Sequence, residues 1–197
     1  MQDTYHALVH RTLPSETRIH QPYTSLAGPL TYGDPALRVM TDLKQVMPFT
    51  ISPFSSLEDA NNKMIIAGVR LLFVTGSNGT LIGLITATDL LGEKPVLYLH
   101  EHGGSRETIQ VQDIMTPANE LEALDFHEVE RATVGDIVKT LEQCGRQHLI
   151  VYQACAGKDC IVRGIFSSTQ LSRQLGTPLA LAPRANTFAQ LNRAIGH

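Results

Sequence analysis

The chain has 197 residues, of which 43% are hydrophobic and 18% charged, and 16 Lys and Arg against 19 Asp and Glu give a formal net charge of -3. This composition is typical of a soluble globular protein, and it lacks the basic excess that non-specific binding to nucleic acid or to an anionic membrane requires. No apolar run approaches the roughly 18 residues of a membrane span, and three cysteines do not suggest a disulfide framework, so we expect a cytoplasmic protein with no nucleic-acid and no membrane partner.

The first 38 residues predict an extended N-terminal arm. Prolines at positions 14, 22, 29 and 35 lie among Thr, Ser, His and Gly, and neither a period of 2 nor one of 3.6 residues persists. Such a pattern favours an irregular chain over a helix or a strand. Regular structure is expected from about residue 39 onward.

A helix is predicted directly after Ser56. Ser56 is a typical N-cap, and Asp59 three residues later favours the positive end of the helix. Gly68 supplies the left-handed stop, and the apolar run 71–74 predicts a short strand covered on both faces. The apolar positions of the helix recur at spacings of three, four and three, which places them on one face: Leu57, Ala60, Met64 and Ala67.

A hairpin and a second helix complete this unit. Asn78-Gly79 is a pair that type I′ turns favour, so the strand over 71–74 should turn back into a strand over 81–85. Thr86 and Asp89 then show again the hydroxyl-to-acid spacing of a helix start. The unit therefore reads as helix, strand, strand, helix.

The same pattern returns 77 positions later. Thr133, Asp136 and Gly145 take the places of the first cap, acid and stop, and a strand follows over 148–152. The hairpin loop over 153–159 is longer than in the first copy, so the final helix is displaced by 81 positions instead. Internal repetition of this kind indicates two similar units that bury their apolar faces together.

A lead-in with Met and Pro precedes each copy, and a first strand is expected before each predicted long helix. Val46-Met47-Pro48 precedes the first copy, and Ile114-Met115-Thr116-Pro117 precedes the second. Each unit then reads as βαββα. The boundaries that follow are 39–98 for the first repeat and 111–176 for the second.

Two segments lie outside the repeats. The linker 99–110 contains His100-Glu101-His102, which we expect in a solvated loop. The tail 177–197 is expected to form a short helix, because Phe188, Leu191 and Ile195 follow helical spacing.

The order of these motifs, which occurs twice, resembles a tandem pair of cystathionine β-synthase (CBS) domains, often called a Bateman module. The resemblance covers about residues 40–176 and rests on Asp113-Ile114-Met115-Thr116-Pro117, the capped helix that ends in glycine, the apolar strand, and the pattern Gly-apolar-apolar-Thr/Ser-x-x-Asp. It implies an α/β (α+β) fold of two βαββα repeats packed with pseudo-two-fold symmetry. It also implies a homodimer through the CBS helices, for which the candidate contacts, or alternatively core residues, are Met64, Leu91, Leu171 and Leu175.

Thr86 and Asp89 are the main candidate site residues. A carboxylate at a helix start accepts paired hydroxyls such as those of a ribose, and free amides there attract phosphate, although the same residues could simply cap the helix. In the family that the chain resembles, the acid contacts the adenosine ribose and the hydroxyl faces the phosphates. The resemblance also places the adenine base against the first strand, here Thr50, Ile51 and Ser52.

Basic residues and the second copy complete the candidate list. Arg70 follows the helix stop, where adenylate-sensing members of the family carry a basic residue, although an exposed arginine at a turn is equally consistent. The second copy keeps Ser167, but Gln170 replaces the acid and loses a charge-assisted hydrogen bond. With His148 at the strand start, these residues form a weaker second site.

The predicted function is a stand-alone regulatory module. It would bind an adenosine-containing ligand, namely AMP, ADP, ATP or S-adenosylmethionine, in the cleft between the repeats and transmit occupancy to a separate effector protein. The alternative is a ligand-free structural dimerisation or adaptor module. No nucleophile motif and no zinc-type cysteine spacing is visible, so we expect neither an enzyme nor a metal site, and no required cofactor.

Overall fold

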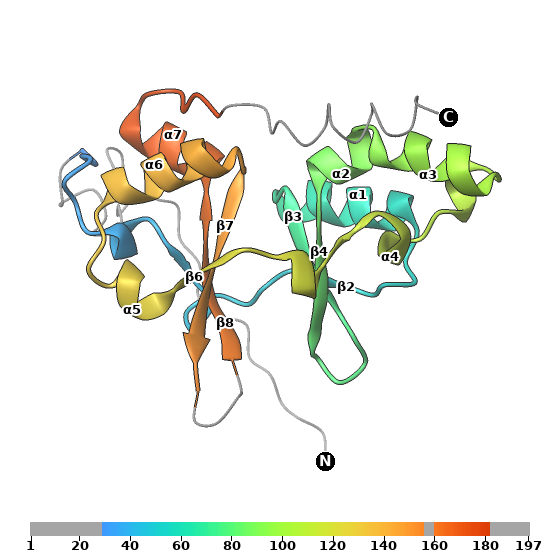
Figure 1. Ribbon diagram of the computed structural model, residues 1–197, viewed down its shortest axis with the longest axis horizontal. Coiled ribbons are helices and arrows are strands. Elements are labelled where there is room, and N and C mark those ends of the chain that lie inside the picture. Colours follow the sequence, from blue (N-terminus) through green and yellow to red (C-terminus); the bar gives the residue numbers. More distant parts are fainter. Residues whose placement is uncertain (1–28, 156–159, 182–197) are drawn as a thin grey trace, which may run out of the picture. The chain divides into compact units, whose positions relative to one another are not determined.

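The computed structural model describes residues 29–155 and 160–181 (Figure 1). From Thr31 onward these residues belong to one compact unit. The strands are β1 (Thr41–Asp42), β2 (Thr50–Ile51), β3 (Leu71–Thr75), β4 (Leu81–Thr86), β5 (Thr116–Pro117), β6 (Ala123–Asp125), β7 (His148–Ala154) and β8 (Cys160–Ser167). The α-helices are α1 (Leu57–Ala67), α2 (Ala87–Leu91), α3 (Lys94–His102), α4 (Val111–Ile114), α5 (Phe126–Val129), α6 (Val134–Cys144) and α7 (Ser168–Leu175).

Two four-stranded sheets form the core of the fold. The first sheet has the strand order β2-β3-β4-β5 and the second the order β1-β8-β7-β6. In each sheet a parallel pair, β2 with β3 or β6 with β7, precedes an antiparallel hairpin. Figure 1 shows α1 and α2 with the first sheet and α6 and α7 with the second. The predicted α/β fold of two repeats is confirmed.

The two long helices begin and end as the sequence predicts. Ser56 and Thr133 each form a reciprocal capping box with the acid three residues later, Asp59 or Asp136. Gly68 and Gly145 end the helices with φ angles of 65° and 59°, a left-handed conformation that glycine adopts without steric cost. Local sequence chemistry therefore fixes both helices in their repeats.

The lead-in strands are exchanged between the sheets. β5, from the lead-in to the second repeat, pairs with β4 of the first sheet, and β1, from the start of the first repeat, pairs with β8 of the second. Thr116 lies opposite Leu84, just as Thr41 lies opposite Ile165. The repeat boundaries in the sequence therefore do not coincide with the sheets.

This exchange corrects the predicted pairing of the lead-ins. The counterpart of Met115 is Met40 and not Met47, because both Met40 and Met115 pack on a glycine of the adjacent strand. A Cβ atom at Gly83 would lie 2.7 Å from Met115 Sδ, and one at Gly164 the same distance from Met40 Sδ. Met47, in contrast, is 89% exposed. The two lead-ins therefore correspond through the methionine that packs on a glycine of the adjacent strand, and not through a Met-Pro pair.

The hairpin and the linker also differ from expectation. The loop between β3 and β4 is wider than a type I′ turn, since the Gly79 amide donates to the Gly76 carbonyl, and Gly79 has a φ of 79°. The histidines of the linker lie in α3 and not in a loop. Ile109 at the end of the linker is fully buried in the core of the first repeat.

Residues 31–38 are not an extended arm, because they dock on the second repeat. The amides of Val134 and Gly135 donate to carbonyls of this segment, and the Ala36 amide donates to the Ala132 carbonyl. Ala36 is buried in the 3-10 helix η2 (Ala36–Arg38). The rest of the predicted arm, except residues 29–30, and the predicted tail helix lie outside the described residues.

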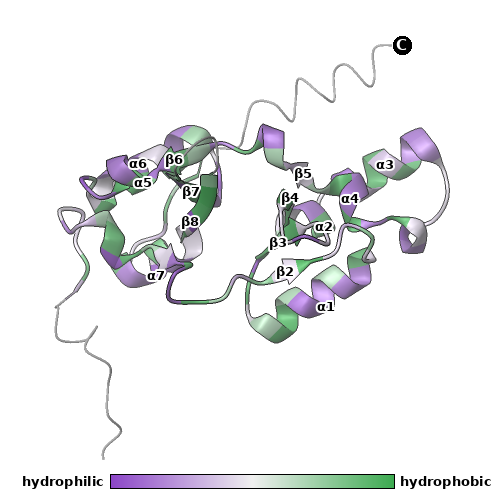
Figure 2. Ribbon diagram, turned by 90° about the horizontal axis from the view of Figure 1, so that it is seen from below, coloured by the Kyte–Doolittle hydropathy of each residue, from purple (hydrophilic) through white to green (hydrophobic). Residues whose placement is uncertain are grey.

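Buried apolar residues join the two sheets. One cluster surrounds the first sheet and includes Val111 and Ile114, while a second combines Leu71, Phe73 and Leu84 of the first sheet with Ile150 of the second. Figure 2 shows the hydrophobic residues of the strands, and their alternation with hydrophilic residues along α1. Met64 and Leu171, two of the candidate dimer contacts, are 3% and 0% exposed and therefore belong to the core.

Candidate functional site

A cavity of about 670 Å³ lies between the two repeats. Buried apolar side chains from both sheets form part of its wall, namely Leu71, Leu84 and Ile150. Polar side chains reach it from α2, from the start of α3, from the segment after β5 and from the start of β7. The strand exchange brings Thr116 of β5 beside Leu84 of β4, so residues of the second lead-in complete a site on the first sheet.

Thr86 and Asp89 face this cavity and form the capping box of α2. Asp89 Oδ2 accepts hydrogen bonds from the Thr86 amide at 2.8 Å and from Thr86 Oγ1 at 2.7 Å, while the Asp89 amide donates to Thr86 Oγ1 at 3.2 Å. The Ala87 amide donates to the Arg70 carbonyl at 2.9 Å. The expectation of free amides at this helix start therefore does not hold for Ala87 and Asp89, because both amides already have acceptors.

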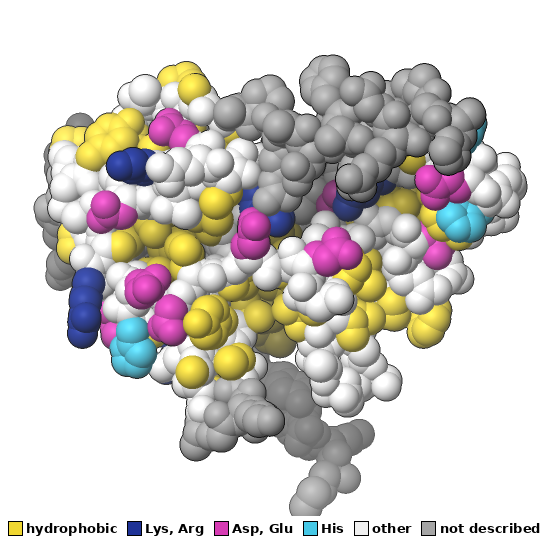
Figure 3. All heavy atoms as spheres, viewed as in Figure 1, with side chains coloured by type: hydrophobic (Ala, Val, Ile, Leu, Met, Phe, Trp, Pro, Cys, Tyr) yellow, Lys and Arg dark blue, Asp and Glu magenta, His cyan; other side chains and the backbone are white. Residues whose placement is uncertain are grey.

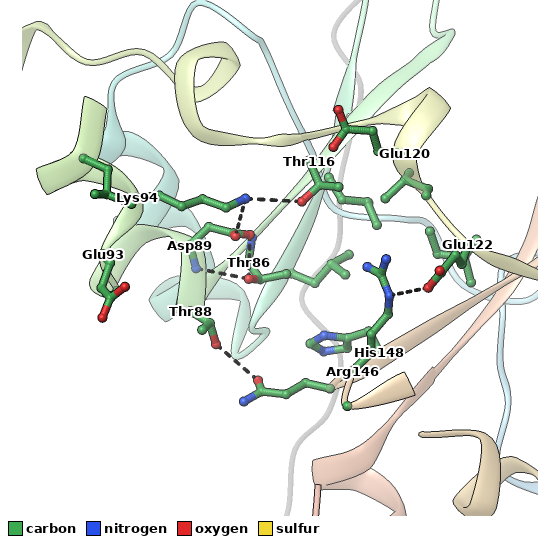
Figure 4. A pocket seen from close by; sticks show the side chains of 18 residues that line it. Thr86, Thr88, Asp89, Glu93, Lys94, Thr116, Glu120, Glu122, Arg146 and His148 are labelled. Atoms are coloured by element: carbon green, nitrogen blue, oxygen red, sulfur yellow. Dashed lines mark hydrogen bonds and ion pairs between the residues drawn. The ribbon is translucent and has the colours of Figure 1, made fainter. Parts of the chain in front are cut away.

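Lys94 is a site residue that sequence reasoning missed. Its Nζ lies 2.7 Å from Asp89 Oδ1, 3.0 Å from the Ile114 carbonyl oxygen and 3.3 Å from Thr116 Oγ1 (Figure 4). An ammonium group has three hydrogens, and three acceptors surround this one. The lysine follows no recognisable motif, and its partner Thr116 arrives only through the exchanged strand.

Arg146 and His148 approach the cavity from the second repeat (Figure 4). Arg146 Nε donates to Glu122 Oε2 at 2.9 Å, which forms an ion pair. Burial, assisted by the positive charge of Arg70, lowers the pKa of the half-buried His148 from 6.5 to about 4 against a smaller opposing effect of Asp89. His148 is therefore neutral at pH 7.

His148 lines the cavity with Thr86 and Asp89, although its partner in the β7–β8 ladder is Ser167 of the predicted second site. Ser167 and Gln170 do not line the cavity. Ser167 makes no side-chain cap, and Gln170 Oε1 accepts from Thr41 Oγ1 at 3.3 Å.

The predicted base-binding segment does not line the cavity. Thr50 and Ile51 form β2, on the edge of the first sheet opposite β5, and Ile51 is only 7% exposed within the core. Ser52 is exposed, and its Oγ accepts from the Phe54 amide. The segment after β5 lines the cavity instead, and its apolar residue there is Leu121.

Arg70 is exposed and does not line the cavity, although its charge affects the pKa of His148. Its carbonyl accepts a hydrogen bond from the Ala87 amide at the start of α2.

The described part of the chain contains neither a cluster of metal ligands nor a helix that could span a membrane. Among residues 29–155 and 160–181, no group of three or more His, Cys, Asp or Glu side chains could hold a metal ion. Within the same residues, no helix has the length and apolar character needed to cross a bilayer.

Comparisons with known proteins agree with this architecture. The CBS domain model matches residues 39–95, while no curated protein sequence matches the chain. CBSX2 of Arabidopsis thaliana in complex with AMP is similar at a TM-score of 0.51 and 23% identity, over 72% of this chain and 95% of CBSX2. An uncharacterised conserved protein from Pyrococcus horikoshii is similar at a TM-score of 0.53 and 20% identity, over 78% and 100% of the two chains.

A third solved structure, the CBS-domain protein ATU1752 from Agrobacterium tumefaciens, has a TM-score of 0.50 and 17% identity, over 69% of this chain and 93% of its own. At these identities the likeness shows a shared fold. The family model identifies the first repeat, and the structure shows the second in the same arrangement. Residues 39–95 therefore match the CBS domain, and the described chain has the fold of a tandem CBS pair.

Proposed function

We propose that this CBS pair is a regulatory module that binds an adenosine-containing ligand in the cavity between its repeats. The observation that carries the proposal is the carboxylate of Asp89, which two hydrogen bonds from Thr86 orient at the wall of a cavity of about 670 Å³. Cavities of this size are typical of small-molecule sites. The AMP complex of CBSX2, which shares the fold, supports an adenosine ligand.

The cavity offers partners for both parts of a nucleoside. A ribose diol would donate to Asp89 Oδ1, the oxygen that Lys94 now contacts, so the sugar would replace or share that interaction. The adenine ring would pack against the apolar wall, where Leu71, Leu84 and Ile150 are 8%, 5% and 5% exposed. Asp89, with 13% side-chain exposure, is sufficiently buried for such a hydrogen bond to matter.

Occupancy could reach a separate effector protein through contacts that cross between the repeats. Lys94 joins α3 to Thr116 on the exchanged strand, and Thr88 Oγ1 donates to Gln147 Oε1 at 3.4 Å. A ligand that changes these contacts would shift the balance between arrangements of the two repeats. The effector would bind one arrangement better than the other.

Calorimetric titration with adenosine, AMP, ADP, ATP and S-adenosylmethionine tests the proposal. Asp89→Asn should weaken the tightest ligand by about ten-fold or more, since it removes a charged acceptor. Asp59→Asn is a matched control, because Asp59 forms the same capping box on α1 but does not line the cavity. The control should lose helix stability without losing affinity.

Two results would contradict the proposal in different ways. No heat and no thermal stabilisation with any of the five compounds at about 1 mM would refute the ligand site. Equal loss of affinity in both variants would show that Asp89 acts only as a cap.

A ligand-free dimerisation or adaptor module is the second candidate. The observation that favours it is an apolar surface on the helices of the first repeat, where Ile65, Ile66 and Leu91 are 69%, 87% and 73% exposed. Asp89 already has partners in Thr86 and Lys94, so the cavity does not need a ligand for stability. This candidate predicts a homodimer by light scattering together with no response to nucleosides.

A further inference from the structure

Carboxylates outnumber cations on the wall of the cavity. Four acidic side chains line it, whereas two basic ones do, an excess of two negative charges: Asp89, Glu93, Glu120 and Glu122 against Lys94 and Arg146. His148 adds no charge at pH 7, because burial and the charge of Arg70 keep its ring neutral. Figure 3 shows acidic and basic side chains next to one another near the middle of the face it presents. The described lining therefore carries a formal excess of negative charge.

Both cations are already engaged with carboxylates. Lys94 lies 2.7 Å from Asp89 and uses its other hydrogens on Ile114 and Thr116, while Arg146 pairs with Glu122 at 2.9 Å. A phosphate group bound to either cation would lie beside the carboxylate that already forms an ion pair with it. The like charge would offset much of the attraction.

Three backbone amides at the two strand-to-helix turns already have acceptors. The Ala87 amide at the start of α2 donates to the Arg70 carbonyl, and the Asp89 amide donates to Thr86. At the corresponding turn of the second repeat, the Ser168 amide donates to the Gln147 carbonyl at 2.9 Å. These are the positions where free amides would cradle a phosphate.

The remaining wall suits an uncharged or cationic group. Leu97 and Leu121 line the cavity beside the buried leucines of the first sheet, so an alkyl or thioether substituent would find apolar contacts. Glu93 and Glu120 lie exposed at the same cavity and would attract a positive charge. From these features we infer that the cavity selects adenosine nucleosides whose 5′ substituent is neutral or cationic over nucleoside phosphates. The inference rests on the proposed adenosine site.

Titration at pH 7.5 of the full chain with 5′-methylthioadenosine, S-adenosylmethionine, adenosine, AMP and ATP tests the selectivity. The first two should bind about ten-fold or more tightly than AMP, and ATP should be the weakest. The preference should shrink as NaCl rises from about 50 to 500 mM, because Glu93 and Glu120 are exposed and screened by salt. Tighter binding of AMP or ATP than of 5′-methylthioadenosine would overturn the inference.

A charge variant provides a second, independent measurement. Glu93→Gln/Glu120→Gln should raise AMP affinity several-fold and leave adenosine affinity unchanged, since only the phosphate senses these charges. Glu58→Gln/Glu142→Gln, on exposed positions of α1 and α6 away from the cavity, is the matched control and should change neither. An unchanged ratio of AMP to adenosine affinity in the first variant would contradict the inference.

The two proposals fail in distinguishable ways. Absence of binding by all five compounds at about 1 mM refutes the adenosine site itself. Binding of adenosine together with a preference for AMP refutes only the selectivity.

Discussion

Corresponding positions of the two repeats have the same backbone arrangement but carry different side chains at the start of the last helix. In the first, Asp89 meets Lys94, which also reaches Thr116 on the exchanged strand. In the second, Gln170 holds the position of the acid and accepts directly from Thr41. The first repeat therefore has a carboxylate, Asp89, at the cavity, whereas the amide of Gln170 in the second repeat is hydrogen-bonded to another side chain of the protein.

At the exchanged strands the charged residues lie in the second sheet and not in the first. Asp42 on β1 and Arg163 on β8 form an ion pair in the second sheet, with the Arg163 guanidinium 4.6 Å above the Phe126 ring. The corresponding positions of the first sheet are Pro117 and Ile82, which cannot form an ion pair. The ion pair therefore lies at the cavity in the first repeat and at the exchanged strand in the second.

The largest expected effect comes from breaking the ion pair of the second sheet. Asp42→Ala should destabilise the chain by about 3 kcal/mol or more in urea unfolding, because Arg163, with 9% side-chain exposure, would be left charged and unpaired. Asp42→Ala/Arg163→Ile, which introduces the isoleucine of the first sheet, should recover most of that loss. A double variant as unstable as the single one would contradict this account.

The same variants should differ in their response to acid. The hydrogen bond from Arg163 holds the pKa of Asp42 below its usual 3.8. Its contribution is present above pH 3.8 and is lost as pH falls through the lower pKa of the folded state. The double variant should lack this component when unfolding is measured below pH 4.

A smaller effect is expected from His148→Leu, which introduces the residue found at Leu71 in the first repeat. The folded-state pKa of about 4 lies below the ordinary 6.5, so between these values the unfolded chain binds the proton first. Stability should fall as pH drops from 6.5 towards 4, and the variant should remove about 1 to 2 kcal/mol of that fall. Parallel pH profiles for the two proteins would refute a buried neutral histidine.

Lys94→Leu should have a still smaller effect on stability. The lysine is 42% exposed, so the loss of its ion pair with Asp89 should cost under about 1 kcal/mol in urea unfolding. Leu175 holds the corresponding position in the second repeat. Adenosine affinity should rise several-fold, because the ribose no longer competes with an ammonium group for Asp89. A decrease would show that Lys94 contacts the ligand directly.

The smallest effect on folding is expected from Ile65→Glu/Ile66→Gln. These substitutions give α1 the side chains that α6 carries at the corresponding positions, Glu142 and Gln143. Both isoleucines are exposed, so unfolding free energy should change by about 0.5 kcal/mol or less. If this surface forms the homodimer, light scattering should show a monomer instead. An unchanged dimer would place the interface elsewhere.

Short sequence signals predict the ends of the two long helices and the strands that follow them. The caps at Ser56 and Thr133 and the stops at Gly68 and Gly145 each depend on a few adjacent residues, and the structure confirms all four. The strands after these glycines were likewise predicted from short apolar runs and correspond to β3 and β7. Thr86 and Asp89 were identified for the same reason, since their spacing is itself a helix start.

Non-local pairing explains what the sequence did not reveal. β1 and β5 have two residues each, too short for any periodicity, and their partners lie in the other repeat or beyond a long connection. Without that exchange, Thr116 cannot be placed beside Lys94 and Asp89. The assignment of the lead-in to Met47 failed because a Met-Pro pair is a weaker indicator than packing on a glycine of the facing strand.

The reciprocal strands also limit how the protein can move. To pull the repeats apart would remove β5 from the first sheet and β1 from the second, and would leave unpaired edges on β4 and β8. A rotation of one repeat against the other that keeps both strand pairings therefore costs much less free energy than separation of the repeats. For the same reason, a single cut within residues 99–110 would not release two independent halves, because each would still hold a strand of the other.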